Sequence, residues 1–320
     1  MRFVKFLFAL FLAALFIAPL RVDAQEKIRI TYANNSLTFL AAFIAKDRGF
    51  YTRNGLDAEL IQARPAVNIA ALLSGDVDYV EVFGSAIRSA ARGAPVRAFS
   101  NSIKAPFFSL IAQPSIKSVK ELKGRVIGVT SIGGTNQISG RLLFQHFGVD
   151  PDKDLKFLAI GEEKFVVEAF KAKRVDAILV APPFSIMMKR EGFPVLANAA
   201  DVVAFPLAGL STTVEKIKQN RAQVKRVLKS EIEALRYLRD DAAAIIDIMR
   251  RRFAMDDALA RDAYGIVVNS FSRDARIPVD SVENVLNLEK KDGLIPKSVT
   301  VEQVTDRSIA EEVLKELGRK

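Results

Sequence analysis

The sequence of 320 residues contains no cysteine and a single histidine. Without cysteine the chain has no disulfide, no thiol nucleophile, no thiolate metal site and no residue to carry a lipid anchor after an export signal. His146, in LLFQHFG, ends a predicted helix next to Gly148, where a structural histidine is favoured over a catalytic one. The motifs G-x-S-x-G and H-E-x-x-H are also absent. These absences argue against an enzyme, and we predict no catalytic residue, no metal ion and no cofactor.

The first residues have the pattern of an export signal. Arg2 and Lys5 precede an uncharged run over residues 6–20, and Val22-Asp23-Ala24 follows it. This order predicts a secretory signal peptide over residues 1–24, cut after Ala24. An uncleaved membrane anchor is the alternative, but the apolar run has 15 residues, whereas a bilayer needs about 20. No later run is long enough, so we expect a mature protein that floats free in the periplasm.

Half of the residues are hydrophobic, which is enough to fill the cores of about two domains at this length. The formal charge is +10, and removal of the predicted signal lowers it to +8. The densest basic segment, over residues 215–240, also spaces its apolar residues as an amphipathic helix does. Its charges therefore indicate a solvated helix face more than a partner site, and we expect no nucleic-acid partner.

Strands and helices alternate twice along the chain. Strands are predicted over residues 27–32, 54–61 and 77–82 with helices between them, and the same order returns over residues 124–180. A shift of 98 residues places Asp78 of GDVDYV on Asp176 of KRVDAILV. The alternative to an internal repeat is that the two segments match by chance, because such α/β patterns are common. We predict two similar α/β lobes with largely parallel sheets: lobe 1 over residues 25–105, lobe 2 over 106–204, and a return to lobe 1 with C-terminal helices over 205–320.

The loop GVTSIGGT, residues 128–135, differs from a phosphate-binding P-loop because Gly134 stands where the lysine belongs. Nucleotide hydrolysis is therefore not expected. In open α/β sheets, ligands bind beyond the carboxyl ends of the strands, where helix N-termini offer unpaired N–H groups. Residues 131–136 hold that position in lobe 2, and residues 34–38 hold it in lobe 1. The alternative is that Ser131 or Thr135 only caps its helix.

Six segments in series resemble the periplasmic solute-binding proteins of ABC importers, in the nitrate/sulfonate/taurine and thiamine-precursor-like family. They are AKDRGFYTRNGLDAELI, LLSGDVDYV, SVKELKGRVIGVTSIGGT, HFGVDPDKDLKFLAIG, VDAILVAPP and FPLAGLSTT. Each motif is weak alone, but their order and spacing are those of the family. One departure is Lys173-Arg174, where the family usually has a glycine before V-D-A; it affects a surface turn.

The resemblance implies a two-lobe type II periplasmic-binding fold, of the Venus-flytrap kind, with two crossovers and a helical C-terminal part. It implies a monomer that captures a small polar or anionic organic solute and delivers it to an ABC permease with its ATPase subunit. We expect hinges near residues 101–113 and 202–209. The ligand contacts it implies are Asn34, Ser36, Thr38, Phe83, Gly84, Ser85, Asn101, Ser102, Ser131, Gly133, Gly134, Thr135, Asn136, Pro182, Pro183 and Phe184.

The nature of the solute is left open by these residues. Phe83, Phe184, Phe107 and Phe108 could enclose a flat or apolar body, with core packing as the alternative. Arg64, after a strand, is a candidate anion clamp, and an exposed loop arginine is the alternative. Glu81 stands in an apolar strand, where it could pair with a cation or a neighbouring basic residue.

Two further functions stay open at this point. The first is a sensory protein that presents bound solute to a signalling receptor. The second is an enzyme related to pyrimidine-precursor synthesis, although enzymes of that kind depend on histidine and cysteine residues that this chain lacks.

Overall fold

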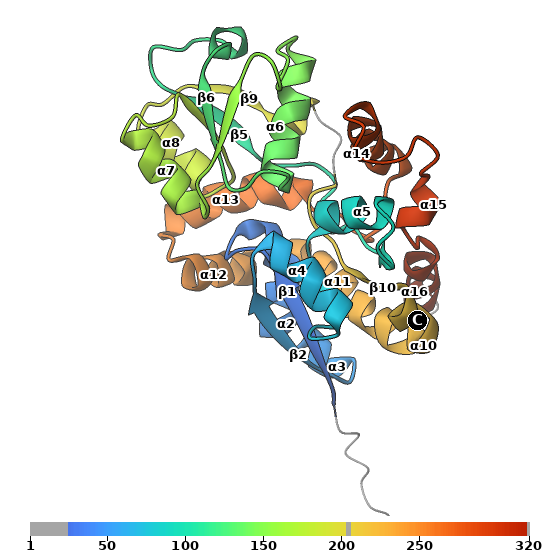
Figure 1. The fold of residues 1–320 in the computed structure, drawn as a ribbon. Coiled ribbons are helices and arrows are strands. Elements are labelled where there is room, and N and C mark those ends of the chain that lie inside the picture. The colour runs from blue at the N-terminus through green and yellow to red at the C-terminus, as the bar shows by residue number, and fades with distance from the viewer. Residues whose placement is uncertain (1–24, 203–205, 319–320) are drawn as a thin grey trace, which may run out of the picture.

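The structure, a computed structural model, describes residues 25–202 and 206–318. The predicted signal peptide and the predicted boundary at residues 204/205 lie outside these residues. Two lobes, each built on one five-stranded sheet, lie one above the other, with helices around both (Figure 1). The prediction of a two-lobe α/β fold is confirmed.

Lobe 1 has the strand order β2-β1-β3-β10-β4. Its strands are β1 (Glu26–Tyr32), β2 (Leu56–Gln62), β3 (Tyr79–Val80), β4 (Val96–Ala98) and β10 (Ser211–Thr213). The helices of its first part are η2 (Leu37–Phe39), α2 (Leu40–Asp47), α3 (Phe50–Arg53), α4 (Pro65–Ser74) and α5 (Phe83–Ala91). In β1 the alternating isoleucines Ile28 and Ile30 are buried in the core, which is why KIRITY forms a strand.

Lobe 2 repeats this design with the order β7-β6-β8-β5-β9. Its strands are β5 (Ser109–Ala112), β6 (Val126–Val129), β7 (Lys156–Ala159), β8 (Ala177–Val180) and β9 (Val195–Asn198). Its helices are η3 (Val119–Leu122), α6 (Thr135–His146), α7 (Glu163–Lys171), α8 (Phe184–Arg190) and α9 (Ala199–Val202). His146 ends α6 and packs its ring edge-on against Phe147, as predicted for a helix-end histidine.

The internal repeat is confirmed at the level of single hydrogen bonds. In lobe 1, Asp78 donates its N–H to Arg29 O (3.0 Å) and accepts the Arg29 N–H on its carboxylate (2.9 Å). In lobe 2, Asp176 makes the same two bonds with Val126, at 2.9 Å each. Each aspartate thus closes the gap where a central strand begins beside its parallel neighbour, and this shared role explains the matching V-D pairs.

Both sheets are largely parallel, and each has one antiparallel strand, β10 in lobe 1 and β5 in lobe 2. These two strands directly follow the two crossovers between the lobes. Each crossover therefore leads into an inner strand of the other lobe, so the two lobes stay connected as long as both sheets are intact.

The crossovers touch each other at Gly209. A Cβ atom at this position would lie 2.2 Å from Ser100 O and 2.9 Å from Asn101 Cα, so only glycine fits. A third segment, which the sequence did not indicate, contacts the first crossover: Asn101 N–H donates to Ala275 O (2.8 Å) and Ser272 N–H donates to Ser102 O (2.8 Å). Three chain segments therefore meet where the lobes are connected.

The C-terminal part is helical, as predicted. It contains α10 (Val214–Gln219), α11 (Arg221–Asp240), α12 (Ala242–Phe253), α13 (Asp257–Ser270), α14 (Val279–Lys291), α15 (Val301–Val304) and α16 (Ser308–Gly318). Most of it packs on lobe 1, with α11 against α2 and with α14 and α15 against α5. The exception is α13, which lies beneath lobe 2 (Figure 1) and contacts α8, where Arg190 and Asp262 form an ion pair at 2.6 Å.

We expect Gly209→Ala to destabilise the protein by roughly 1–3 kcal/mol or more, because the added methyl group must displace backbone atoms of the other crossover. Gly265→Ala is the control, since Gly265 lies inside α13 with no atom within 4 Å of an added Cβ. Alanine there should stabilise by about 0.5–1 kcal/mol. Urea unfolding measures both, and equal midpoints for the two variants would contradict the close crossing.

Candidate functional site

The predicted contacts of both lobes follow the carboxyl ends of strands. In lobe 1, residues 34–38 connect β1 to α2, Arg64 precedes α4, and residues 83–85 open α5. In lobe 2, residues 131–136 connect β6 to α6, and residues 182–184 connect β8 to α8. This is the edge at which open α/β sheets bind ligands.

In the first loop of lobe 1, Ser36 caps the short helix η2 by accepting the Thr38 N–H at 3.3 Å. Asn34 is half-buried, and its side-chain oxygen is buried with no hydrogen-bond partner among the described residues. Arg64 is exposed at the start of α4. Asn34 is therefore the residue of this loop with an unused acceptor.

The aromatic candidates divide into two groups. Phe83 is fully buried, and Phe107 and Phe108 are each 4% exposed. Phe107 stacks on Phe271 with ring centroids 6.3 Å apart. Phe184 is half-buried at the start of α8, beside the cis-peptide-linked Pro182 and Pro183. Core packing thus accounts for Phe107 and Phe108, while Phe184 retains free surface.

Asn101 and Ser102 lie in the first crossover, where the sequence predicts a hinge, and their polar groups are engaged there. Asn101 is fully buried, and its amide nitrogen faces Ile103 O at 2.7 Å and Ala208 O at 3.0 Å. The Ser102 N–H donates to Ala208 O at 2.9 Å. Both residues therefore hold the two crossovers together, a role that the sequence motifs did not reveal.

The loop before α6 is held in place by its own side chains. Gly133 has φ +70° and donates its N–H to Gln137 Oε1 at 2.6 Å. Asn136 accepts the Thr130 N–H at 3.3 Å and donates to Leu179 O at 2.7 Å. The N–H groups of Thr135 and Asn136, in the first turn, find no acceptor in the described part of the chain. These two donors are available to a ligand.

Gly134 has an ordinary φ of −78°, so its backbone conformation does not require glycine. The space beside its Cα is what limits the side chain at this position. A Cβ added there would lie 2.2 Å from Ser131 Oγ. A larger residue must push the Ser131 side chain out of place, and it would cover the start of α6.

A buried carboxyl group lies behind the β8–α8 loop. Glu163 is 7% exposed, and within the described part of the chain its carboxyl group accepts one hydrogen bond, from the Ala181 N–H at 3.4 Å. Burial raises the pKa of Glu163 to about 8, and the Ala181 hydrogen bond offsets part of this rise. At neutral pH this carboxyl group is therefore mainly protonated.

A buried pair of carboxyl groups lies in lobe 1. The sequence left open whether Glu81 pairs with a cation or with a basic residue, and the structure places Glu231 of α11 beside it. Burial, and then repulsion from Glu231, raise the pKa of Glu81 well above its usual range. Burial also raises the pKa of Glu231 to about 7, although hydroxyl hydrogen bonds from Ser100 and Ser102 oppose the rise. The partner was not visible in sequence because 150 residues separate the two glutamates.

Arg88 of α5 joins the two lobes, and the sequence gave no sign of it. The residue is 8% exposed. Its Nη2 donates to Gly133 O in the lobe 2 loop and to Ser85 Oγ at 3.3 Å, and its Nε lies 3.9 Å from Glu289 Oε1. Its Nη1 is buried and has no hydrogen-bond partner among the residues that the structure describes. This arginine brings a positive charge between Ser85 and Gly133, two of the predicted contacts.

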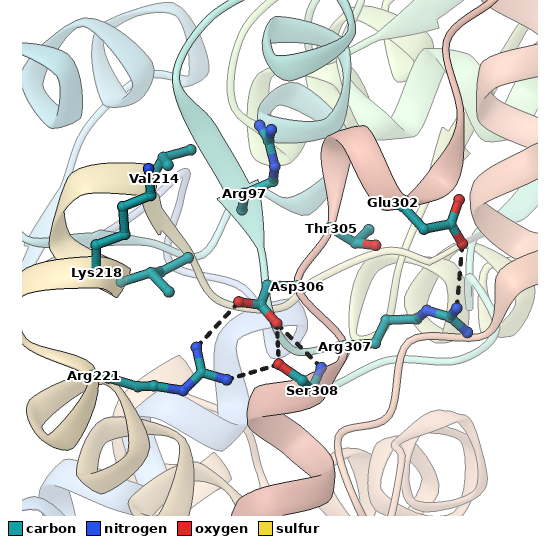
Figure 2. A pocket seen from close by; sticks show the side chains of 10 residues that line it. Arg97, Val214, Lys218, Arg221, Glu302, Thr305, Asp306, Arg307 and Ser308 are labelled. Carbon is teal, nitrogen blue, oxygen red and sulfur yellow. Dashed lines mark hydrogen bonds and ion pairs between the residues drawn. The ribbon is translucent and has the colours of Figure 1, made fainter.

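A pocket of about 590 Å³ lies elsewhere, at an outer edge of lobe 1 (Figure 2). Two ion pairs lie in its wall: Arg221 pairs with Asp306 at 3.3 Å, and Arg307 pairs with Glu302 at 3.3 Å. None of the predicted contacts lines this pocket. It is not the site that the strand-end loops form.

Comparison with known proteins decides the family. The model described as "NMT1/THI5 like" matches residues 36–244, more than half of the chain. The chain belongs to the NMT1/THI5-like family. Among curated relatives, YtlA of Bacillus subtilis (strain 168), whose name describes a binding protein, is 21% identical over 96% of each chain.

Two solved structures share the fold of this NMT1/THI5-like protein. The alkanesulfonate-binding protein SsuA of Xanthomonas axonopodis pv. citri, bound to MOPS, has a TM-score of 0.74 and 18% identity, with 88% of this chain and 98% of that chain covered. The periplasmic nitrate-binding protein NrtA of Synechocystis PCC 6803 has a TM-score of 0.76 and 15% identity, covering 92% and 89%. The fold is that of periplasmic binding proteins.

One curated relative is an enzyme. The 4-amino-5-hydroxymethyl-2-methylpyrimidine phosphate synthase of Schizosaccharomyces pombe (strain 972 / ATCC 24843) is 29% identical over 133 residues, 37% of this chain and 38% of that protein.

Within residues 25–202 and 206–318, no group of three or more histidine, cysteine, aspartate or glutamate side chains is arranged to hold a metal ion. No helix of the described part is long and apolar enough to cross a membrane.

The raised pKa of Glu163 predicts a pH-dependent stability. The native state keeps the Glu163 proton up to about pH 8, whereas the unfolded chain loses it near its usual pKa of about 4.3. The native state therefore binds more protons in this window, and stability falls as pH rises. We expect Glu163→Gln to match the wild type at pH 4 and to be more stable by on the order of 1–3 kcal/mol at pH 8.5.

Glu168→Gln is the matched control, because Glu168 is exposed on the same helix. Urea unfolding at pH 4, 6 and 8.5 measures the three proteins. A constant difference between Glu163→Gln and the wild type across this range would contradict a protonated Glu163.

Proposed function

We propose that this protein is the extracytoplasmic solute-binding component of an ABC importer. It captures a small polar or anionic organic solute between its two lobes and delivers it to a membrane permease driven by an ATPase subunit. The signal peptide over residues 1–24 directs it to the periplasm, where the mature chain acts as a monomer. The observation that carries this proposal is the pair of lobes with one topology, joined by crossovers, in which Arg88 of α5 in lobe 1 donates to Gly133 O in the strand-end loop of lobe 2.

The site chemistry supports binding rather than turnover. The candidate groups are N–H donors, an amide oxygen and a guanidinium, none of which is a nucleophile poised beside a base. Family membership and the shared fold with sulfonate- and nitrate-binding proteins point in the same direction. A solute bound by such groups is recognised by hydrogen bonds and charge.

An enzyme of pyrimidine-precursor synthesis is the second candidate, and the partial likeness to the fission-yeast synthase favours it. Against it stand the single histidine and the absence of cysteine in this chain. A sensory protein would use the same solute-binding step as an importer component. The two roles differ only in the membrane protein that receives the solute-loaded protein.

We expect the mature protein to form a 1:1 complex with one member of a panel of nitrate, small sulfonates and aminopyrimidines, and to release it chemically unchanged. Native mass spectrometry measures the stoichiometry, and chromatography of the released solute measures turnover. Steady accumulation of a product would support the enzyme instead. Loss of solute uptake in a deletion strain distinguishes the importer from a sensor.

The loop before α6 gives a second test. Gly134→Val should weaken solute binding by about tenfold or more, because valine displaces Ser131 and covers the two free N–H groups. Thr135→Ala should lower the affinity by only roughly two- to tenfold, the value of one neutral hydrogen bond. Ile132→Val is the control, since Ile132 is exposed in the same loop. Calorimetric titration of variants that circular dichroism shows to be folded gives the affinities; wild-type affinity for Gly134→Val would remove this loop from the site.

A further inference from the structure

The guanidinium of Arg88 is buried, charged and only partly paired. Its Nη2 has two acceptors, Gly133 O and Ser85 Oγ, and its Nε faces Glu289, whereas its Nη1 has no partner in the described part of the chain. Burial lowers the pKa of Arg88 to about 10, so the side chain remains charged at neutral pH. A buried charged donor without an acceptor is costly, and such a group is suited to a ligand.

The nearby carboxylate does not cancel this charge. Glu289 of α14 is shared, because Arg92 Nη2 lies 2.9 Å from its Oε2 while Arg88 Nε lies 3.9 Å from its Oε1. Two guanidinium groups thus face one carboxylate, which leaves a net positive charge beside the lobe interface.

The other side of this interface is also positive. Gly133, whose carbonyl accepts from Arg88, comes two residues before the first turn of α6, a helix of 12 residues. The free N–H groups of Thr135 and Asn136 stand at this N-terminus, where the helix dipole favours an anion. The guanidinium of Arg88 in lobe 1 therefore lies close to the N-terminus of α6 in lobe 2, because it donates a hydrogen bond to the loop that precedes this helix.

We propose that an oxyanion of the solute, a carboxylate or a sulfonate, binds between Arg88 of lobe 1 and the first turn of α6 in lobe 2. This inference rests on the proposed function and narrows the solute to an anion. Because the two halves of the subsite come from different lobes, the anion favours the arrangement in which they are close. Arg88 thus couples recognition of charge to closure.

The test compares anions with neutral molecules of the same shape. We would titrate the wild-type protein with methanesulfonate and dimethyl sulfone, with acetate and acetamide, and with MOPS, and also with any solute that co-purifies. We expect at least one anion to bind, and its neutral counterpart to bind about 10–100-fold more weakly, the value of one charge-assisted hydrogen bond. Equal binding of both members of a pair would overturn the inference, and this comparison needs no variant.

Two variants then separate a ligand contact from a structural link between the lobes. Arg88→Gln should lose about 10–100-fold in affinity for the anion and keep its weak affinity for the neutral counterpart, whereas Arg88→Lys should lose less because it keeps the charge. Arg97→Gln is the matched control: it removes one positive charge from the same lobe, but the Arg97 guanidinium donates to Val96 O at 2.8 Å, and neither Glu289 nor Gly133 is among its partners. Its affinity should stay within about threefold.

The outcomes also distinguish this inference from the proposed function. If a neutral or cationic solute binds tightly and Arg88→Gln does not change its affinity, the anion subsite is wrong and the binding function stands. If Arg88→Gln weakens anion and neutral counterpart equally, Arg88 only links the lobes and the inference is again wrong. If no solute binds and none co-purifies, both proposals fail.

Discussion

The close crossing of two chain segments at Gly209 and Ser100 is the constraint on which the two-lobe arrangement depends. Ser100 O occupies the space that a side chain at position 209 would need, so the crossovers are held at backbone contact. The Ser100 hydroxyl accepts the Leu210 N–H at 2.8 Å and donates to Glu231 at 3.0 Å. The crossovers are thereby connected to α11 and to the buried glutamate pair of lobe 1. Each crossover then enters the centre of a sheet, which fixes where the lobes can move.

Near these crossovers, charged side chains connect lobe 2 to lobe 1 or to the C-terminal helices at three places. Arg88 reaches Gly133, Arg190 pairs with Asp262, and Arg141 of α6 pairs with Asp292 at 2.8 Å. The C-terminal helices α13 and α14 supply the two carboxylate partners, and the partner of Arg88 is a backbone carbonyl oxygen. Such contacts are weak when exposed, so lobes held mainly by them can separate and close again. The buried contact of Arg88 differs from the others, because a solute anion would complete it.

The parts of the fold that could be predicted from the sequence are those that depend on neighbouring residues along the chain. Asp78 and Asp176 could be aligned from sequence because each serves the same pair of hydrogen bonds at the start of a short central strand. The loops around Ser36 and Gly133 could be placed because strand, loop and helix follow one another along the chain. The turn at Lys173 explains why the family usually has a glycine near this position. Lys173 adopts φ 58°, a conformation that glycine accepts more readily.

Contacts between distant segments could not be predicted. Arg88 and Gly133 lie 45 residues apart in different lobes, and Glu81 meets Glu231 only because α11 packs under the first sheet. The third segment at the crossovers, which contains Ser272 and Ala275, comes from a helical region in which no pattern indicates contact with the crossovers.

Closure of the two lobes on a solute is tested most directly by small-angle scattering of the mature protein, with and without the solute selected by the binding screen. Closure of the lobes on the solute predicts a smaller radius of gyration at saturation, and an unchanged scattering curve at saturation would contradict it.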